Sequence, residues 1–84
     1  LRNRIIYIDH FGNAVTGVRA ISVKKDACLE INGQAFHKAV TYNDVLPGTS
    51  FWYENANGLI EIAVNQGRAN EQYGINIGDE LLWG

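Results

Sequence analysis

Short runs of apolar and β-branched residues, separated by turn residues, recur along the whole chain. Arg4–Ile8 is the first such run, and Ala14–Val23 follows it with imperfect alternation of apolar and polar positions. Such runs favour strands, and the polar, glycine-containing segment Asp9–Asn13 between them favours a turn. We therefore expect two successive strands joined by a tight turn, with Gly17 marking a bulge or a close backbone approach in the second.

A hairpin is predicted at Asn32-Gly33, which separates the apolar runs 27–31 and 34–42. Asn-Gly is typical of a two-residue type I′ turn, because both central residues of that turn need a positive φ. A turn of this length fixes the strand register and places Leu29 opposite Phe36 on one face of the hairpin.

Three later runs complete the pattern. Phe51–Asn55 and Leu59–Val64 are predicted strands on either side of an Asn57-Gly58 turn, and Glu80–Trp83 is a last short strand. The segment 67–73 lacks strand alternation and has room for one helical turn. About seven short strands with at most one short helical turn predict an all-β fold, a small antiparallel β-barrel, closed or partly open.

Composition and charge narrow the class of partner. The chain has a net charge of −2 and scattered basic residues, which disfavours nucleic acid or an anionic membrane as the main partner. One cysteine excludes an internal disulfide, and two histidines offer no ligand spacing for zinc, so no metal is expected. No run is long enough to span a membrane and no signal peptide is visible. A reducing, cytoplasmic location is the expectation.

The chain begins at Leu1 and contains no methionine. A complete translation product begins with methionine, which is not usually removed before a bulky leucine. We therefore expect residues 1–84 to form a single domain of a longer protein, whose activity needs residues outside them.

Candidate chemistry gathers at the end of the first predicted strand. Asp9, Phe11, Gly12 and Asn13 lie within five residues, where a rigid scaffold can present polar groups to a ligand. Asp9 supplies an acceptor, and the Asn13 amide both donates and accepts. Two interpretations stay open: a ligand site, or a turn in which Asp9 and Asn13 bond to their own backbone.

Four segments follow one another in the order and at the intervals of a known family. Residues 8–16 (IDHFGNAVT) match the pattern IDxFGNxxTN, and residues 55–65 (NANGLIEIAVN) match NSxGxLEIAxN. Tyr42–Gly48 fits YxdvpxG, and Ile75–Asp79 fits lgixxGD. Together they resemble the C-terminal domain of the S-adenosyl-L-methionine (SAM) hydroxide adenosyltransferases, the SAM hydrolases related to fluorinase and chlorinase.

The resemblance implies a reaction in which SAM and water give adenosine and L-methionine, with SAM as substrate and no cofactor. It also implies that the C-terminal domain closes the SAM site against a neighbouring subunit's N-terminal domain, usually in a homotrimer. The water-activating residues belong to that N-terminal domain, so none of residues 1–84 is catalytic and the isolated domain is expected to be inactive. The choice between water and a halide stays open, because it lies in that other domain.

The resemblance further assigns four side chains by motif position. Asp9 would accept hydrogen bonds from the methionine ammonium, where a charge-assisted bond is about twice as strong as a neutral one. Asn13 would read the adenine edge. Phe11 would pack within the site, and Tyr42 would offer its ring face to the adenine, where stacking is worth about 1–3 kcal/mol.

In the second motif and at the residue after it, the resemblance assigns the backbone of Val64 and Gln66 to the adenine. It assigns the Asn57 N–H to the methionine carboxylate. Two positions depart from the family pattern: Ala56 replaces a serine expected near the methionine, and Gly17 replaces the asparagine of "TN". A lost hydrogen bond to a charged group costs about 1.5–3 kcal/mol. The departures therefore motivate an alternative, a nucleoside-binding or oligomerisation module that has lost catalysis.

Two further expectations concern residues outside these assignments. Glu61 interrupts an apolar predicted strand, and we expect it to anchor a loop by hydrogen bonding rather than to transfer protons. A third hypothesis is an OB-like barrel that binds single-stranded nucleic acid through Phe36, Trp52 and Tyr53. The acidic charge balance disfavours it.

Overall fold

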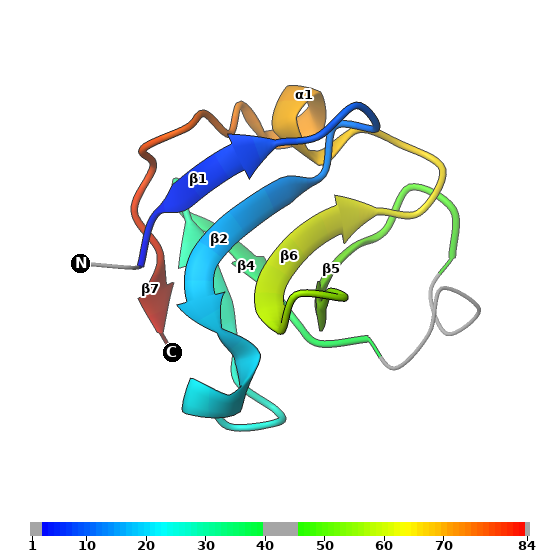
Figure 1. Ribbon diagram of the computed structural model, residues 1–84. Helices are drawn as coiled ribbons and strands as arrows, with labels where there is room; N and C mark the ends of the chain where they lie inside the picture. Colours follow the sequence, from blue (N-terminus) through cyan, green and yellow to red (C-terminus); the bar gives the residue numbers. More distant parts are fainter. Residues whose placement is uncertain (1–2, 40–45, 84) are drawn as a thin grey trace.

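The computed structural model describes residues 3–39 and 46–83, and Figure 1 shows their arrangement. These residues contain seven strands, one short α-helix and one 3-10 turn, which confirms the predicted all-β class. The elements are β1 (Ile5–Ile8), β2 (Ala14–Arg19), η1 (Ala20–Ser22), β3 (Leu29–Ile31), β4 (Gln34–Phe36), β5 (Ser50–Glu54), β6 (Leu59–Val64), α1 (Ala69–Tyr73) and β7 (Leu82–Trp83). No helix among them is long and apolar enough to cross a membrane.

The strands form two antiparallel sheets, of order β1-β2-β6-β5 and β4-β3-β7. Isolated bridges join the sheets at both pairs of edges: Arg4 pairs with Glu80 next to β7, and Lys38, just after β4, pairs with Trp52 of β5. Figure 1 shows β1, β2 and β6 side by side, with β4 behind them. The edges of the two sheets are thus bridged on both sides, but the ladders of the described residues divide into two sheets and do not close into one barrel.

The predicted hairpin at Asn32-Gly33 is confirmed. Leu29 pairs with Phe36, and the two turn residues have φ values of 54° and 81°. The second strand of the hairpin is shorter than predicted and ends at Phe36. It ends there because the next residues turn to the other sheet, where His37 O accepts a hydrogen bond from the Trp52 N–H. Residues 40–42 of the predicted strand lie outside the described residues.

The second predicted strand, 14–23, is also shorter, because the chain turns into η1 after Arg19. The pairing of β2 with β6 shifts register between Val15 and Arg19, which spans Gly17, and the Gly17 N–H bonds to Arg4 O at 3.1 Å. The expected irregularity around Gly17 is therefore present.

Side-chain alternation along β6 separates two environments. Ile60 and Ile62 point into the main core, which also holds Trp52, whose Nε1–H donates to Ala27 O at 2.8 Å. Ala63 belongs to a second, smaller apolar cluster on the other face of the sheet, with Ala39, Phe51 and Tyr53. Glu61 alternates onto this second face as well, so a carboxylate is buried outside the main core.

Candidate functional site

The β1–β2 turn is held together by the Asp9 side chain. Its Oδ1 accepts hydrogen bonds from the backbone N–H groups of Phe11 and Asn13, both at 2.9 Å. The Asp9 N–H donates to Asn13 O at 3.0 Å, and the Gly12 N–H donates to Asp9 O at 3.0 Å. The turn-holding interpretation therefore applies to Asp9. It does not apply to the Asn13 side chain, which bonds to another strand.

The same turn packs against the segment that precedes α1. Gly12 has a φ of +83°, and a Cβ built on it would lie 2.7 Å from Arg68 Cβ and 2.7 Å from Asn70 Oδ1. The Asn70 N–H donates to Gly12 O at 3.0 Å, and Arg68 Nη1 donates to His10 O at 2.9 Å. Glycine is needed here because of both the left-handed backbone and the close approach.

A cavity of about 580 Å³ opens between this turn and the end of β6. This volume falls within the roughly 300–1,000 Å³ typical of small-molecule sites. Six residues line it: Phe11, Asn13, Val64, Gln66, Gly67 and Arg68. Four of these were expected from the sequence, and the cavity thus brings together residues from two motifs that lie far apart along the chain.

Gly67 and Arg68 are the lining residues that the sequence did not single out. They follow Gln66, the first residue after the second motif, and this adjacency was the available signal. The backbone there turns sharply, since Gln66 has a φ of 60° and the Gly67 N–H donates to Val64 O at 3.1 Å. Arg68 also pairs with Glu71, Nε to Oε2, at 2.7 Å.

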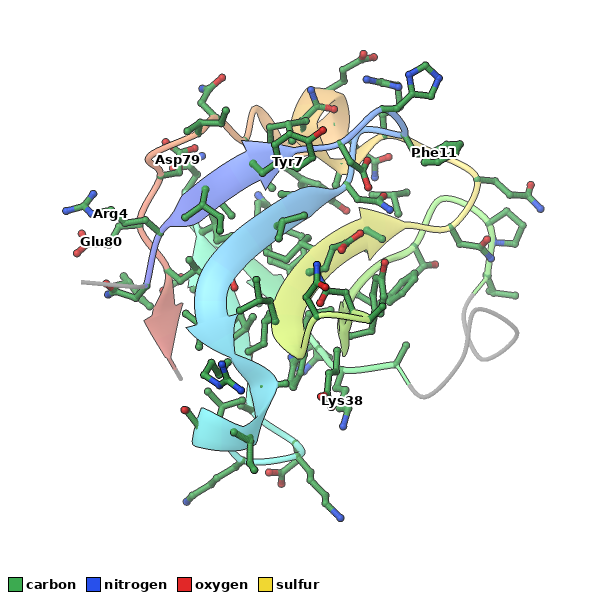
Figure 2. All side chains as sticks on the ribbon, in the orientation of Figure 1. Arg4, Tyr7, Phe11, Lys38, Asp79 and Glu80 are labelled. Carbon is green, nitrogen blue, oxygen red and sulfur yellow. The ribbon has the colours of Figure 1, made fainter. Side chains whose placement is uncertain are left out.

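Phe11 lies at the rim of the cavity, with 70% of its surface exposed. Figure 2 shows it at the end of the molecule where α1 lies, far from the end that carries Lys38. Its ring contacts His10 edge to face, with centroids 5.4 Å apart. The residue expected to pack within the site is therefore exposed beside it and available to a ligand.

Asn13 links the cavity to the buried carboxylate of Glu61, which does not itself line the cavity. Asn13 is buried and its Nδ2 donates to Glu61 Oε2 at 3.2 Å. The same oxygen accepts the Tyr53 hydroxyl at 2.7 Å, and Oε1 accepts Asn55 Nδ2 at 3.0 Å. Only 6% of Glu61 is exposed. Glu61 is thus an anchor, as expected, and three donors compensate for removing its carboxylate from water.

Asn55 carries this network into the β5–β6 turn. Its Oδ1 accepts the backbone N–H groups of Asn57 at 2.9 Å and Leu59 at 3.0 Å. Ala56 and Asn57 are exposed in this turn and do not line the cavity. The Asn57 N–H assigned to the methionine carboxylate is therefore engaged by Asn55 in this structure. Tyr42 lies outside the described residues, and its assignment stays a prediction.

Burial argues against the nucleic-acid hypothesis. Phe36 and Trp52 are fully buried in the main core, so neither ring is available to stack on a base. Tyr53 is partly buried and bonded to Glu61.

In the described residues, no three His, Cys, Asp or Glu side chains gather as a metal site would need.

Known proteins share this sequence pattern. Residues 3–82 match the family model described as the SAM hydroxide adenosyltransferase C-terminal domain. The chain is 30% identical over 78 residues to an (R)-S-adenosyl-L-methionine hydrolase of Salinispora tropica, and 32% identical over 74 residues to one of Thermus thermophilus. These matches cover 92% and 88% of this chain but 30% and 28% of the relatives. The chain therefore spans less than a third of their length.

Solved structures share the fold. The crystal structure of a conserved hypothetical protein from Thermus thermophilus matches with a TM-score of 0.85 at 30% identity, covering 96% of this chain and 34% of that one. An uncharacterised protein from Thermotoga maritima matches with a TM-score of 0.80 at 26% identity, covering 98% and 35%. Since the family model spans nearly the whole sequence, the chain belongs to the SAM hydroxide adenosyltransferase family and corresponds to its C-terminal domain.

Proposed function

We propose that this chain is the substrate-recognition domain of a SAM hydrolase, an enzyme that converts SAM and water to adenosine and L-methionine. Two named SAM hydrolases match most of the chain, which supports the reaction class. The observation that carries the proposal is the cavity that unites Phe11 and Asn13 of one family motif with Val64 of another and with Gln66, which directly follows that second motif.

The lining of the cavity suits an adenine ring. Asn13 offers an amide, which can donate and accept at the same time, and adenine presents an amino donor beside a ring-nitrogen acceptor. Phe11 offers an exposed ring for stacking. Val64 and Gln66 also line the cavity, and we place the remaining polar contacts of the base on their backbone.

Asp9 is our candidate for the methionine end of SAM. Its Oδ1 is occupied by two backbone N–H groups, and we assign Oδ2 to the methionine ammonium. A carboxylate suits this role because charge-assisted bonds are about twice as strong as neutral ones. We assign no methionine contact to the Asn57 N–H in the conformation seen here, since it donates to Asn55.

We further propose that the site is completed by an N-terminal domain, supplied by a neighbouring subunit in a homotrimer of the full-length protein. The exposed Phe11 at the rim supports a site that is closed by another surface. In this proposal residues 1–84 supply recognition alone, the other domain activates water, and the enzyme works in the cytoplasm.

The test measures turnover and binding in the full-length protein that carries this domain. Incubation with SAM should release adenosine and methionine in equal amounts, and chloride should yield no 5′-chloro-5′-deoxyadenosine. The isolated domain should release neither product. Calorimetry with adenosine, SAM and methionine adds the second arm: adenosine binding without turnover would support the nucleoside-binding module, and no binding of any of the three would overturn the proposal.

A further inference from the structure

We propose that Glu61 sets the purine specificity of the cavity by fixing the orientation of the Asn13 amide. In this role Glu61 is a positioning residue, because it touches Asn13 and not the ligand. The inference rests on the proposed function, since it takes a purine nucleoside as the ligand. Beyond that function, the inference names the chemical group that the site accepts at purine position 6 and the residue that determines this preference.

The first step is the direction of the Asn13 amide. Glu61 Oε2 accepts the Tyr53 hydroxyl at 2.7 Å and Asn13 Nδ2 at 3.2 Å, so the NH₂ side of the Asn13 amide faces Glu61. The amide oxygen then points away from Glu61. Asn13 lines the cavity, and in the described residues Oδ1 accepts no hydrogen bond. The oxygen and the second N–H of the amide are therefore available to a ligand.

The second step is the match to the ligand. An asparagine oxygen accepts from the 6-amino group of adenine while its N–H donates to N7, a pairing worth about 1–3 kcal/mol of discrimination. Hypoxanthine carries an oxygen at position 6, which would face the Asn13 oxygen. With Glu61 in place, we expect the site to favour adenosine over inosine by about 10–100-fold.

The third step is that Asn13 is the residue of this network whose side-chain amide can rotate by 180° and exchange the positions of its oxygen and nitrogen. Asn55 is fixed, because its oxygen already accepts the N–H groups of Asn57 and Leu59. The Tyr53 hydroxyl can either donate or accept, so it adapts to its partner. Asn13 has no second side-chain bond in the described residues, and only the carboxylate holds its orientation.

Replacing Glu61 by glutamine then has a defined consequence. The new amide oxygen stays toward Asn55 Nδ2, which cannot turn, and the new Nε2–H₂ group faces Tyr53 and Asn13. Tyr53 can accept one of these N–H groups. Asn13 must rotate its amide to present Oδ1 to the other, which turns Nδ2 toward the cavity. That orientation donates to a 6-oxo group and opposes a 6-amino group.

The experiment compares adenosine and inosine binding by calorimetry in the full-length protein and in its Glu61→Gln variant. The wild type should prefer adenosine about tenfold or more, and Glu61→Gln should lose or reverse this preference. Tyr53→Phe is the matched control: it removes a donor to the same carboxylate without changing what Asn13 faces, so the preference should remain. A purely structural role of Glu61 would weaken both nucleosides equally and leave their ratio unchanged.

A wild-type ligand series keeps the inference testable if Glu61→Gln does not fold. Purine riboside has only hydrogen at position 6, so the expected order of affinity is adenosine, purine riboside, inosine. Inosine binding more tightly than purine riboside would overturn the inferred amide orientation. An unchanged adenosine-to-inosine ratio in Glu61→Gln would overturn the role of Glu61. In both cases the proposed function would stand, because it is tested separately by the release of adenosine and methionine from SAM.

Discussion

Gly12 lies so close to Arg68 that a Cβ added to the glycine would fall 2.7 Å from the arginine Cβ. This contact joins the turn that carries Asp9 and Asn13 to the segment that closes the other side of the cavity. The position of one cavity wall against the other therefore depends on the absence of a single methyl group.

Gly12→Ala tests this contact, with Gly33→Ala as its control. The two glycines have nearly the same positive φ, +83° and +81°, but a Cβ at Gly33 would meet no atom within 4 Å. Both substitutions should lose about 1–2 kcal/mol of unfolding free energy from the left-handed backbone. Gly12→Ala should lose about 1–3 kcal/mol more from the overlap. Chemical denaturation measures both, and equal losses would show that the neighbours of Gly12 give way freely.

Substitutions at Asp9 can separate its structural role from its proposed ligand role. Asp9→Asn keeps an oxygen for the N–H groups of Phe11 and Asn13, so its thermal unfolding should stay close to that of the wild type. The loss of charge should raise KM for SAM about 10–100-fold, since a hydrogen bond to a charged group contributes about 1.5–3 kcal/mol. Asp9→Ala should impair both properties. A KM for SAM in Asp9→Asn equal to that of the wild type would show that Asp9 stabilises the turn and does not bind the substrate.

Tyr53→Phe measures what one donor contributes to the buried carboxylate. The variant keeps the ring packed beside Phe51 but removes the 2.7 Å bond to Glu61. Unfolding free energy should fall by about 1.5–3 kcal/mol, the range for hydrogen bonds to charged groups. The matched change Tyr7→Phe, on an exposed ring, should cost less than about 0.5 kcal/mol. Similar small effects from both would mean that the carboxylate is stabilised without Tyr53.

The parts of the fold that the sequence predicted are those decided by neighbouring residues. The Asn32-Gly33 hairpin and its register follow from turn chemistry, and the bounds of Leu59–Val64 follow from a dense apolar run between turn residues. The early ends of the second strand and of the hairpin were not predictable in this way. They depend on where the chain must turn to reach the other sheet, which is a tertiary constraint.

In the site, too, the sequence predicted what depends on neighbouring residues and not what depends on tertiary packing. An acid inside an apolar strand indicated that Glu61 must be hydrogen bonded, but nothing local identified its partners. Asn13 is 48 positions away, and only the pairing of β2 with β6 brings the two together. Arg68 lines the cavity for a similar reason, because the close approach of Gly12 to the segment before α1 is set by packing.

Phe11→Ala tests whether the exposed ring at the rim serves a ligand or only covers the turn. With 70% of its surface exposed, the side chain contributes little burial, so unfolding free energy should change by less than about 0.5 kcal/mol. Adenosine affinity should fall about 10–100-fold, because stacking on an aromatic ring is worth about 1–3 kcal/mol per base. Ile77→Ala is the control, since Ile77 is 63% exposed and does not line the cavity. It should alter neither stability nor affinity. A Phe11→Ala protein that binds adenosine as tightly as the wild type would remove the ring from the site and leave Asn13 as the main contact of the base on this turn.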